Sequence, residues 1–203
     1  MTKQTIWYET QLPNIVLDSI QPNSIPQQST VYDDTGEKVI NNKIRNSKSI
    51  PINSDHWIFS FIWYYLYKSN IDNFRYDIEE LESDSLEYST YSSGEYYFWH
   101  KDSAINHKFK KTHDTCVDGQ TYNFIQENIS KSRKLSFILN LSDYNEYSGG
   151  NIQFLSETGK VYFAPRTKGA IIIFDSRSSY RIQKVNDGTK KVLFGHAIGP
   201  EWR

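Results

Sequence analysis

The sequence has little of what marks secreted or membrane-spanning chains. It contains a single cysteine, Cys116, so no disulfide can form within the chain and a reducing compartment is expected. The first residues hold no apolar run long enough for a signal peptide. The most apolar stretch, residues 57–67, is about half as long as a bilayer crossing requires. We therefore expect a soluble, cytoplasmic protein that has no membrane partner.

An excess of charge of one sign is also missing. The chain has 23 Lys and Arg against 24 Asp and Glu, which leaves a formal net charge of -1. This balance gives no clear signal for nucleic-acid binding. The sequence is instead rich in aromatic residues, with 15 Tyr and 11 Phe among 203 residues. Because large rings bury much area per residue, one domain of this size can form a real core.

No internal repeat or low-complexity linker divides the chain, so we expect one domain spanning residues 1–203. Residues 1–55 are rich in Asn, Ser, Gln and Pro, and are expected to wrap around the domain as an arm that could cover a substrate. Residues 56–85 should contain a helix and a lead-in, with Ser54 or Asp55 as the N-cap. Apolar residues near a 3.6-residue period predict that this helix is largely buried: Trp57, Phe59, Ile62, Trp63 and Leu66.

The remaining residues, 86–200, have the pattern of a mainly β core. Short apolar segments alternate with glycine-containing turn signals, which is typical of an all-β sandwich or a closed barrel. One helix ahead of many strands argues against a doubly wound α/β fold. The predicted strands cover residues 75–78, 86–91, 96–100, 134–141, 151–155, 170–174, 180–184 and 190–198.

The first candidate for chemistry is the pair His100 and Asp102. Residues two apart in a strand point to the same face, so the imidazole and the carboxylate can aim at one point. Together with a second histidine such a pair forms the facial triad that holds Fe(II) in non-haem oxygenases, with positions left open for cosubstrate and O2. On its own a His-x-Asp pattern is common by chance, and a surface pair explains it better.

An ordered set of motifs around the pair supports the metal hypothesis. In chain order they are Tyr91-Ser-Ser-Gly94, His100-Lys-Asp102, Arg133-Lys-Leu-Ser136, Leu139-Asn140, Gly149-Gly150, the apolar run from Gly169 to Phe174, and Gly188-Thr-Lys190. In this order and spacing they resemble the prolyl 4-hydroxylase-like branch of the Fe(II)/2-oxoglutarate oxygenases. The resemblance covers roughly residues 40–200 and includes the segment Ile44-Arg45-Asn46-Ser47.

This resemblance implies a double-stranded β-helix, or jelly-roll barrel, with a supporting N-terminal helix. It implies that His100 and Asp102 bind Fe(II), and that Lys190 pairs with the distal carboxylate of 2-oxoglutarate. Tyr91 matches a tyrosine that reaches the cosubstrate, although a core aromatic residue is an alternative reading. The implied activity is hydroxylation of a C–H bond in a peptidyl, prolyl-type substrate or in a small molecule.

The chain departs from the family pattern at the third iron ligand. The position of the distal histidine falls on Tyr180, and no histidine lies between His113 and His196. Tyr180 could bind iron as a phenolate, since tyrosine is a known iron ligand. Alternatively His196 could serve, because it shares a strand face with Lys190. Two protein ligands could also suffice, because 2-oxoglutarate itself chelates the metal, or the chain could be an altered, non-catalytic relative.

Three functions follow from these alternatives: an oxygenase, a binding protein on the same barrel, or a cupin-like metal barrel of another reaction class. Specificity is expected in residues 1–55 and in residues 103–130. The latter segment carries His107 and His113 in a basic stretch, which predicts a solvated loop at the barrel mouth or a lid that contacts substrate.

Overall fold

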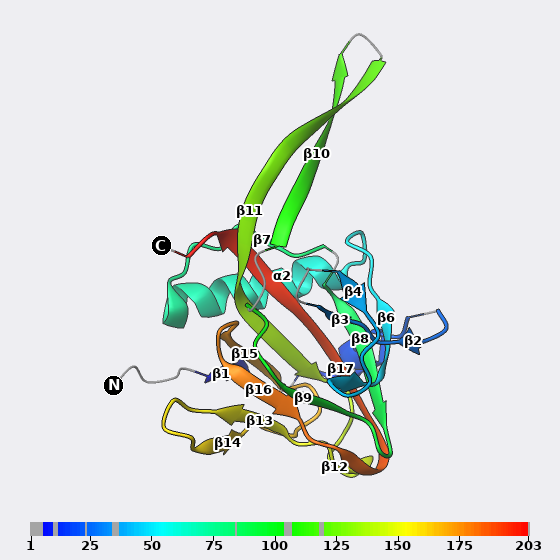
Figure 1. Ribbon diagram of the computed structural model, residues 1–203. Coiled ribbons are helices and arrows are strands. Elements are labelled where there is room, and N and C mark those ends of the chain that lie inside the picture. Colours follow the sequence, from blue (N-terminus) through cyan, green and yellow to red (C-terminus); the bar gives the residue numbers. More distant parts are fainter. Residues whose placement is uncertain are drawn as a thin grey trace.

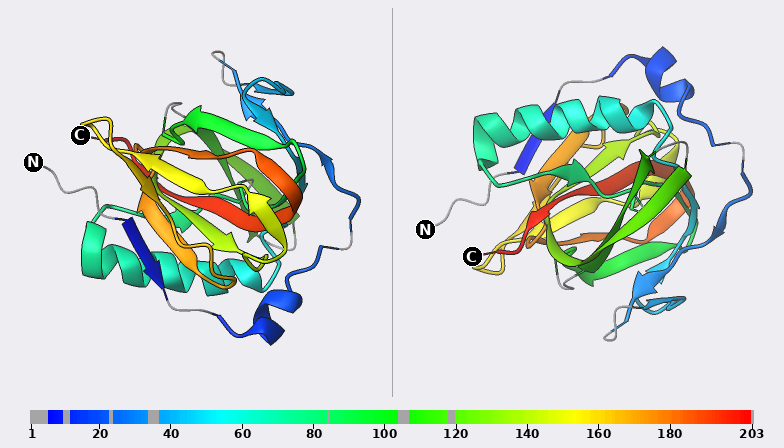
Figure 2. Two further views of the ribbon diagram at one scale, coloured as in Figure 1. Left: turned by 90° about the horizontal axis from the view of Figure 1, so that it is seen from below. Right: turned by 90° about the horizontal axis from the view of Figure 1, so that it is seen from above.

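The computed structural model describes residues 6–9, 12–22, 24–33, 37–83, 85–103, 107–117 and 120–202. Two antiparallel sheets face each other, and a helix lies against the outer side of the larger sheet (Figures 1 and 2). None of the helices in these ranges is long and apolar enough to cross a membrane. The predicted mainly β, jelly-roll architecture with a supporting helix is thereby confirmed.

The larger sheet contains ten strands among the described residues. In spatial order the main path is β1 (Ile6–Glu9), β15 (Ile171–Asp175), β11 (Gln120–Asn140), β17 (Val185–Pro200), β8 (Glu87–Ser92), β6 (Lys48–Pro51) and β2 (Gln27–Gln28). Three further strands pair with this path: β10 (His107–Val117) with β11, and β7 (Glu80–Leu81) and β12 (Tyr147–Gly149) with β17.

The smaller sheet closes the other side of the barrel. Its order is β14 (Val161–Phe163), β13 (Ile152–Leu155), β16 (Ser179–Ile182), β9 (Tyr96–His100) and β5 (Arg45–Asn46). A separate hairpin joins β3 (Val31–Tyr32) to β4 (Lys38–Val39). The helices are α1 (Asn14–Asp18), α2 (Ile58–Ser69) and a π-helical turn, η1 (Asn70–Phe74).

The central strands of the larger sheet are buried on both faces, which explains their nearly continuous apolar runs. Leu135, Phe137 and Leu139 of β11 pack toward α2. The alternate residue Ile138 belongs instead to the barrel interior, together with Phe154 and Phe174 of neighbouring strands. Because the side-chain period of a strand is two, Ser136 of β11 faces the same interior. The barrel therefore presents a polar position inside an otherwise apolar core.

Helix α2 starts later than predicted. It begins at Ile58, and the N–H of Ile58 donates to Nδ1 of His56 at 3.3 Å, so neither Ser54 nor Asp55 caps it. Ile58, Ile62 and Leu66 form the buried face. Trp57, which was expected on that face, is 45% exposed because it precedes the first helical turn. The predicted role of the helix in backing the sheet is confirmed.

Two predictions of local structure were wrong. Residues 75–78 form no strand, because the side chain of Asn70 bonds both the N–H and the carbonyl of Tyr76 at 2.8 Å and so replaces a strand partner. Residues 107–117 and 120–130 pair as strands β10 and β11 rather than forming a loop, and this ribbon projects from the barrel (Figure 1). The ladder of a two-stranded ribbon satisfies its own backbone, so a hairpin can form without a strong apolar pattern.

Candidate functional site

His100 ends β9, and Asp102 lies in the turn that follows. His100 Nδ1 is 2.7 Å from the carbonyl of Phe98, and a carbonyl only accepts, so Nδ1 carries the proton. The lone pair of a neutral His100 is therefore on Nε2, which is buried without a hydrogen-bond partner and lies 3.5 Å from Oδ1 of Asp102. When His100 is neutral, two acceptors therefore face each other in a buried place. A cation between them would remove this conflict.

Asp102 is held by donors on both of its oxygens. Tyr180 Oη donates to Oδ1 at 3.2 Å, and Ser136 Oγ donates to Oδ2 at 2.6 Å. Burial alone would raise the pKa of Asp102, but the charge of His196 and the proximity of His100 outweigh burial and hold this pKa below its usual range. The carboxylate is therefore ionised and fixed in orientation.

Ser136 is the centre of a small buried network. Its single hydroxyl hydrogen goes to Asp102, so Ser136 must accept from Ser176 Oγ at 2.9 Å and from His196 Nδ1 at 3.0 Å. His196 Nδ1 is 3.6 Å from Oδ2 of Asp102, the oxygen opposite to the one that faces His100. The predicted inward orientation of His196 agrees with this geometry. Because its Nδ1 donates to Ser136, that atom is not available as a metal ligand.

Tyr180 lies directly across from His100. The two residues are paired in register between β16 and β9, and their ring centroids are 4.2 Å apart. Burial, followed by the negative charge of Asp102, raises the pKa of Tyr180 well above its usual value of 10, so the phenol is neutral and donates to the carboxylate. Phe154 and Phe174 pack against its ring and hold it in place. His100, Asp102 and Tyr180 therefore converge on one point.

Lys190 lies elsewhere in the interior, on β17. Its side chain is 1% exposed, and Nζ donates to Tyr147 Oη at 3.0 Å and to Asn140 Oδ1 at 3.4 Å. Burial, followed by repulsion from Arg166, lowers the pKa of Lys190 to about 7. Lys190 is thus a buried cation, and its hydrogen-bond partners among the described residues are neutral.

Tyr91 is the cross-strand partner of Lys190, but the two side chains end in different places. The Tyr91 hydroxyl is buried near Arg45 and Ser47, and makes no hydrogen bond of acceptable geometry with either. The Tyr91 hydroxyl is close enough to Tyr180 to contribute to the raised pKa of that phenol. Tyr91 is therefore buried in the interior with its hydroxyl toward the end that contains His100, while the ammonium of Lys190 reaches Tyr147.

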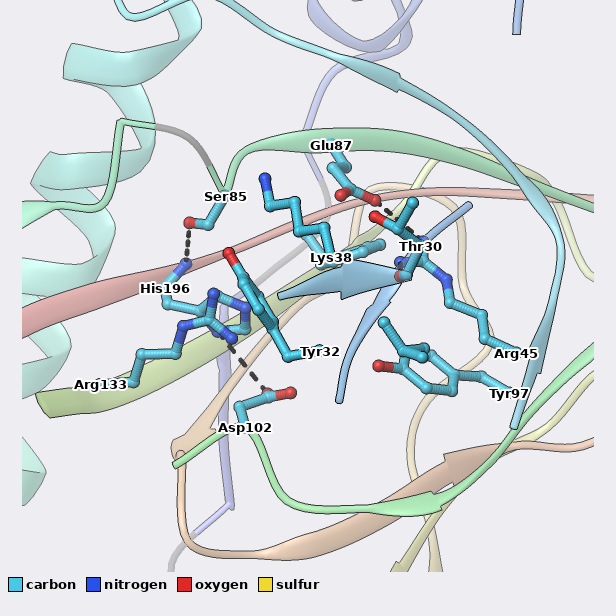
Figure 3. A pocket seen from close by; sticks show the side chains of 12 residues that line it. Thr30, Tyr32, Lys38, Arg45, Ser85, Glu87, Tyr97, Asp102, Arg133 and His196 are labelled. Carbon is cyan, nitrogen blue, oxygen red and sulfur yellow. Dashed lines mark hydrogen bonds and ion pairs between the residues drawn. The ribbon is translucent and has the colours of Figure 1, made fainter. Parts of the chain in front are cut away.

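A cavity of about 50 Å³ opens beside Asp102 and His196 (Figure 3). Tyr32 of β3 and Lys38 of β4 line it from the hairpin side, so part of the N-terminal segment covers this place. Arg133, whose guanidinium lies 5.6 Å from the centre of the Tyr32 ring, also lines the cavity and is paired with the buried Glu82 at 2.6 Å. At roughly 10–15 Å³ per water, the cavity has room for a few water-sized groups.

Sequence reasoning did not single out several residues that shape these sites. Ser136 is part of the Arg133-Lys-Leu-Ser136 motif. Its place on the strand, two residues before the inward-facing Ile138, would have identified it as an interior residue. Tyr147 and Arg166 had no such signal, because their proximity to Lys190 depends on how β12 and a loop fold over the barrel. In the part of the chain that is described, no three His, Cys, Asp or Glu side chains are grouped to hold a metal. Among the side chains that the structure describes, a third ligand beside His100 and Asp102 would therefore be of another type.

Comparison with known proteins places this geometry in a known architecture. No family model matches the chain, and no curated protein matches it in sequence. Solved structures do match. A prolyl-4-hydroxylase of Pseudomonas putida superposes with a TM-score of 0.62 at 12% identity, over 98% of this chain and 94% of that one. The fold is that of the prolyl hydroxylases.

Two further structures share the prolyl hydroxylase fold. The viral collagen prolyl hydroxylase of Paramecium bursaria Chlorella virus 1, in complex with 2-oxoglutarate, matches with a TM-score of 0.58 at 16% identity over 96% of each chain. HygX of Streptomyces hygroscopicus, with nickel and 2-oxoglutarate bound, matches with a TM-score of 0.59 at 11% identity over 98% of this chain and 86% of that one. At these identities the likeness concerns the fold, and the predicted resemblance in fold is confirmed.

Proposed function

We propose that this chain is an Fe(II)- and 2-oxoglutarate-dependent oxygenase that hydroxylates a C–H bond of a peptidyl, prolyl-type or small-molecule substrate. The observation that carries the proposal is the convergence of His100 Nε2, Asp102 Oδ1 and Tyr180 Oη, with a buried nitrogen lone pair left unpartnered. Structures of the same fold are prolyl hydroxylases and an enzyme holding nickel and 2-oxoglutarate, which supports the choice of reaction class.

The residues fit a bound Fe(II). One imidazole nitrogen and two oxygens form a donor set that suits iron. The hydrogen bond from His100 Nδ1 to the Phe98 carbonyl fixes the tautomer that leaves Nε2 as a ligand. Tyr180 would have to lose its proton on binding. A positive charge close to the phenol lowers its pKa, whereas Asp102 alone raises it.

The residues also fit the cosubstrate. Lys190 is a buried cation whose hydrogen-bond partners among the described residues are neutral. A carboxylate would give it an anionic partner and a charge-assisted hydrogen bond. When bound, Fe(II) and 2-oxoglutarate would together supply the oxidising chemistry, in which O2 is consumed and succinate and CO2 are released. The chain's own residues would bind the two groups, orient them and exclude water. The cavity beside Asp102 is our proposed place for the substrate group that reacts.

Among the alternatives for the third ligand, we favour Tyr180 over His196. Tyr180 reaches the same carboxylate oxygen that His100 faces, whereas His196 lies at the other oxygen. His196 Nδ1 is also engaged with Ser136. We propose that His196 orients and charge-balances Asp102 rather than binding the metal.

The test joins spectroscopy to turnover. Loading the chain with Fe(III) should produce the visible absorption of an iron–phenolate bond, and Tyr180→Phe should abolish it while the fold is retained. With Fe(II), the wild-type chain should form succinate from 2-oxoglutarate. A colourless Fe(III) complex would contradict Tyr180 as a ligand, and absence of succinate at any substrate tried would contradict the oxygenase.

The alternative is a catalytically impaired or non-catalytic relative that acts as a binding protein. Its support is the neutral Tyr180 phenol, which already donates to Asp102 as a structural hydrogen bond would. Tyr180→His separates the two readings. A sharp gain in Fe(II) affinity and turnover would identify the wild-type site as impaired, whereas unchanged or weaker binding would favour Tyr180 as a working ligand.

A further inference from the structure

The ring of Tyr147 has a positive charge near it from two different elements. Lys190 Nζ on β17 is 4.7 Å from the ring centroid and also donates to the hydroxyl. The guanidinium of Arg166, in the segment between β14 and β15, lies 4.6 Å from the same centroid. Arg166 also donates to the Tyr147 carbonyl at 3.0 Å. Three elements of the chain thus bring two cations to one aromatic side chain.

Neither cation has an anionic partner among the described residues. Lys190 donates to the neutral Tyr147 and Asn140, and Arg166 donates to the Tyr147 carbonyl and to Asn151. Arg166 Nε is buried and makes no hydrogen bond. The carboxylates closest to this ring along the chain accept from backbone N–H groups of their own turn, Glu146 Oε1 from Asp143 at 2.7 Å and Asp143 Oδ1 from Asn145 at 3.2 Å.

Two cations at one ring repel each other, and the pKa of Lys190 reflects both its burial and this repulsion. The cost of such an arrangement is removed when an anion lies between the charges. A carboxylate fits the available donors, which are an ammonium, a guanidinium N–H and a phenol hydroxyl. The donors that an anion would need are therefore gathered at one aromatic ring, and Lys190 is the most buried of them.

We propose that Lys190, Arg166 and Tyr147 form one anion-binding site, in which Arg166 supplies a second positive charge to the bound carboxylate. The proposal rests on the proposed function only for the identity of the anion, which would be the distal carboxylate of 2-oxoglutarate. Arg166 then contributes to affinity for a dicarboxylate and is more than a support for the nearby turn.

The competing explanation is purely structural. By bonding Tyr147 and Asn151, Arg166 braces the segment that contains Gly149 and Gly150, where the backbone has positive φ angles of 71° and 59°. A bracing role predicts that any substitution lowers the melting temperature, whether or not charge is retained. An anion-binding role predicts that charge decides the outcome.

The experiment therefore compares Arg166→Gln with Arg166→Lys by calorimetric titration of the full chain with 2-oxoglutarate and with succinate, beside thermal melting. Lys168→Gln is the matched control, because this lysine is two residues away and pairs at 3.1 Å with the exposed Asp18. We expect Arg166→Gln to weaken both dicarboxylates roughly tenfold or more, Arg166→Lys to retain most of the affinity, and Lys168→Gln to change nothing. Equal losses in both Arg166 variants, in step with their melting temperatures, would overturn the proposal.

Two further arms separate this proposal from the oxygenase. Titration with and without Ni²⁺ tests whether a metal at His100 and Asp102 strengthens 2-oxoglutarate, and titration with sulfate tests a simple anion. Metal-independent binding that still depends on Arg166, including binding of sulfate, would support the anion site and count against the oxygenase. Failure of the wild-type chain to bind any of the three anions would overturn the anion site itself.

Discussion

The two ends of the barrel interior have opposite charge imbalances. At one end the buried His100 Nε2, an acceptor when the imidazole is neutral, and the acceptor Asp102 Oδ1 face each other across 3.5 Å. At the other end Lys190 and Arg166 both lie near the ring of Tyr147, and their hydrogen-bond acceptors among the described residues are neutral. One continuous cluster of buried side chains contains both Tyr180 and Tyr147, so the two ends belong to the same interior.

The ends also differ in how their polar groups are held. Asp102 receives hydrogen bonds from Ser136 and Tyr180, so the orientation of its carboxylate is determined before any ligand arrives. Lys190 has two neutral partners, one of them at 3.4 Å, and its position depends mainly on packing. We infer that the first end is preorganised for a metal, while the second attracts its ligand chiefly by charge. Substitutions should therefore affect the ends independently.

The largest expected effect is on the metal end. Asp102→Asn keeps the shape of the side chain but removes the charge that, with His100, would hold a divalent cation. We expect metal affinity to fall by more than about 100-fold, because loss of a ligand should exceed the 10- to 100-fold cost of losing a residue that only supports one. Titration with Fe(II) or Ni²⁺ measures this loss.

Asp175→Asn serves as the control for Asp102→Asn. Asp175 is an ion-paired carboxylate on β15 that bonds Arg177 and Tyr76, so its substitution should cost stability but not metal affinity. Sulfate binding at Lys190 should be unchanged in both variants. If Asp102→Asn weakened sulfate as much as it weakened the metal, the two ends would not be independent.

The next effect concerns the anion end and has opposite signs for stability and binding. Lys190→Met removes a buried cation that has no carboxylate partner, so the ligand-free protein should become more stable, by roughly 1–3 kcal/mol. The same change should weaken 2-oxoglutarate by about 10- to 100-fold, as loss of a charge-assisted bond implies. Urea unfolding and calorimetric titration measure the two quantities.

Lys131→Met gives the contrast for Lys190→Met. Lys131 is also buried, but it pairs with Glu79 and Glu80 at 2.6 Å, so its loss should lower stability and leave 2-oxoglutarate binding unaffected. Destabilisation by Lys190→Met would mean that its bonds to Tyr147 and Asn140 outweigh the cost of burying the charge.

Local periodicity predicted part of both ends. Lys190 and His196 are six residues apart on β17 and were expected on a common face. His100 and Asp102 were expected on one face of a strand, but β9 ends at His100, and the turn after the strand brings Asp102 close to the imidazole. The motif order also identified Tyr180 as the residue at the distal ligand position, and the register of β16 with β9 puts it opposite His100.

The remaining residues depend on contacts between strands that no local pattern contains. Ser136 meets His196 because β11 pairs with β17 in that register, 60 residues apart in sequence. Arg166 reaches Tyr147 from an irregular segment, for which hydrophobic periodicity has no meaning. The strand expected at residues 75–78 failed for a different reason, because the side-chain amide of Asn70, six residues earlier, bonds the backbone of Tyr76.

A smaller effect should follow from loosening the preorganised end. Ser136→Ala deprives Asp102 Oδ2 of its 2.6 Å bond, so the carboxylate can turn away from His100. We expect about a tenfold loss of metal affinity and roughly 1.5–3 kcal/mol of stability. Ser89→Ala, which removes a buried serine bonded to Arg45 at 3.0 Å, should lower stability without affecting the metal. Equal metal affinity in the two variants would refute the orienting role of Ser136.

The smallest effect is a dependence of stability on pH that belongs to one end only. The pKa of Lys190 is about 7 in the folded chain against 10.5 for an ordinary lysine, so between these values the unfolded chain binds more protons than the folded one. Stability should therefore rise with pH across this window, by at most about 1.4 kcal/mol per pH unit, and the slope should be smaller in Lys190→Met.

Saturating 2-oxoglutarate should flatten the slope in the wild-type chain, because a bound carboxylate raises the pKa of Lys190 toward its usual value. Urea unfolding at pH 7.0, 8.0 and 9.0, with and without the ligand, measures all four slopes. If the wild-type slope is unchanged at saturating 2-oxoglutarate, the carboxylate does not reach Lys190. Another anion would then have to pair with the cations at that end.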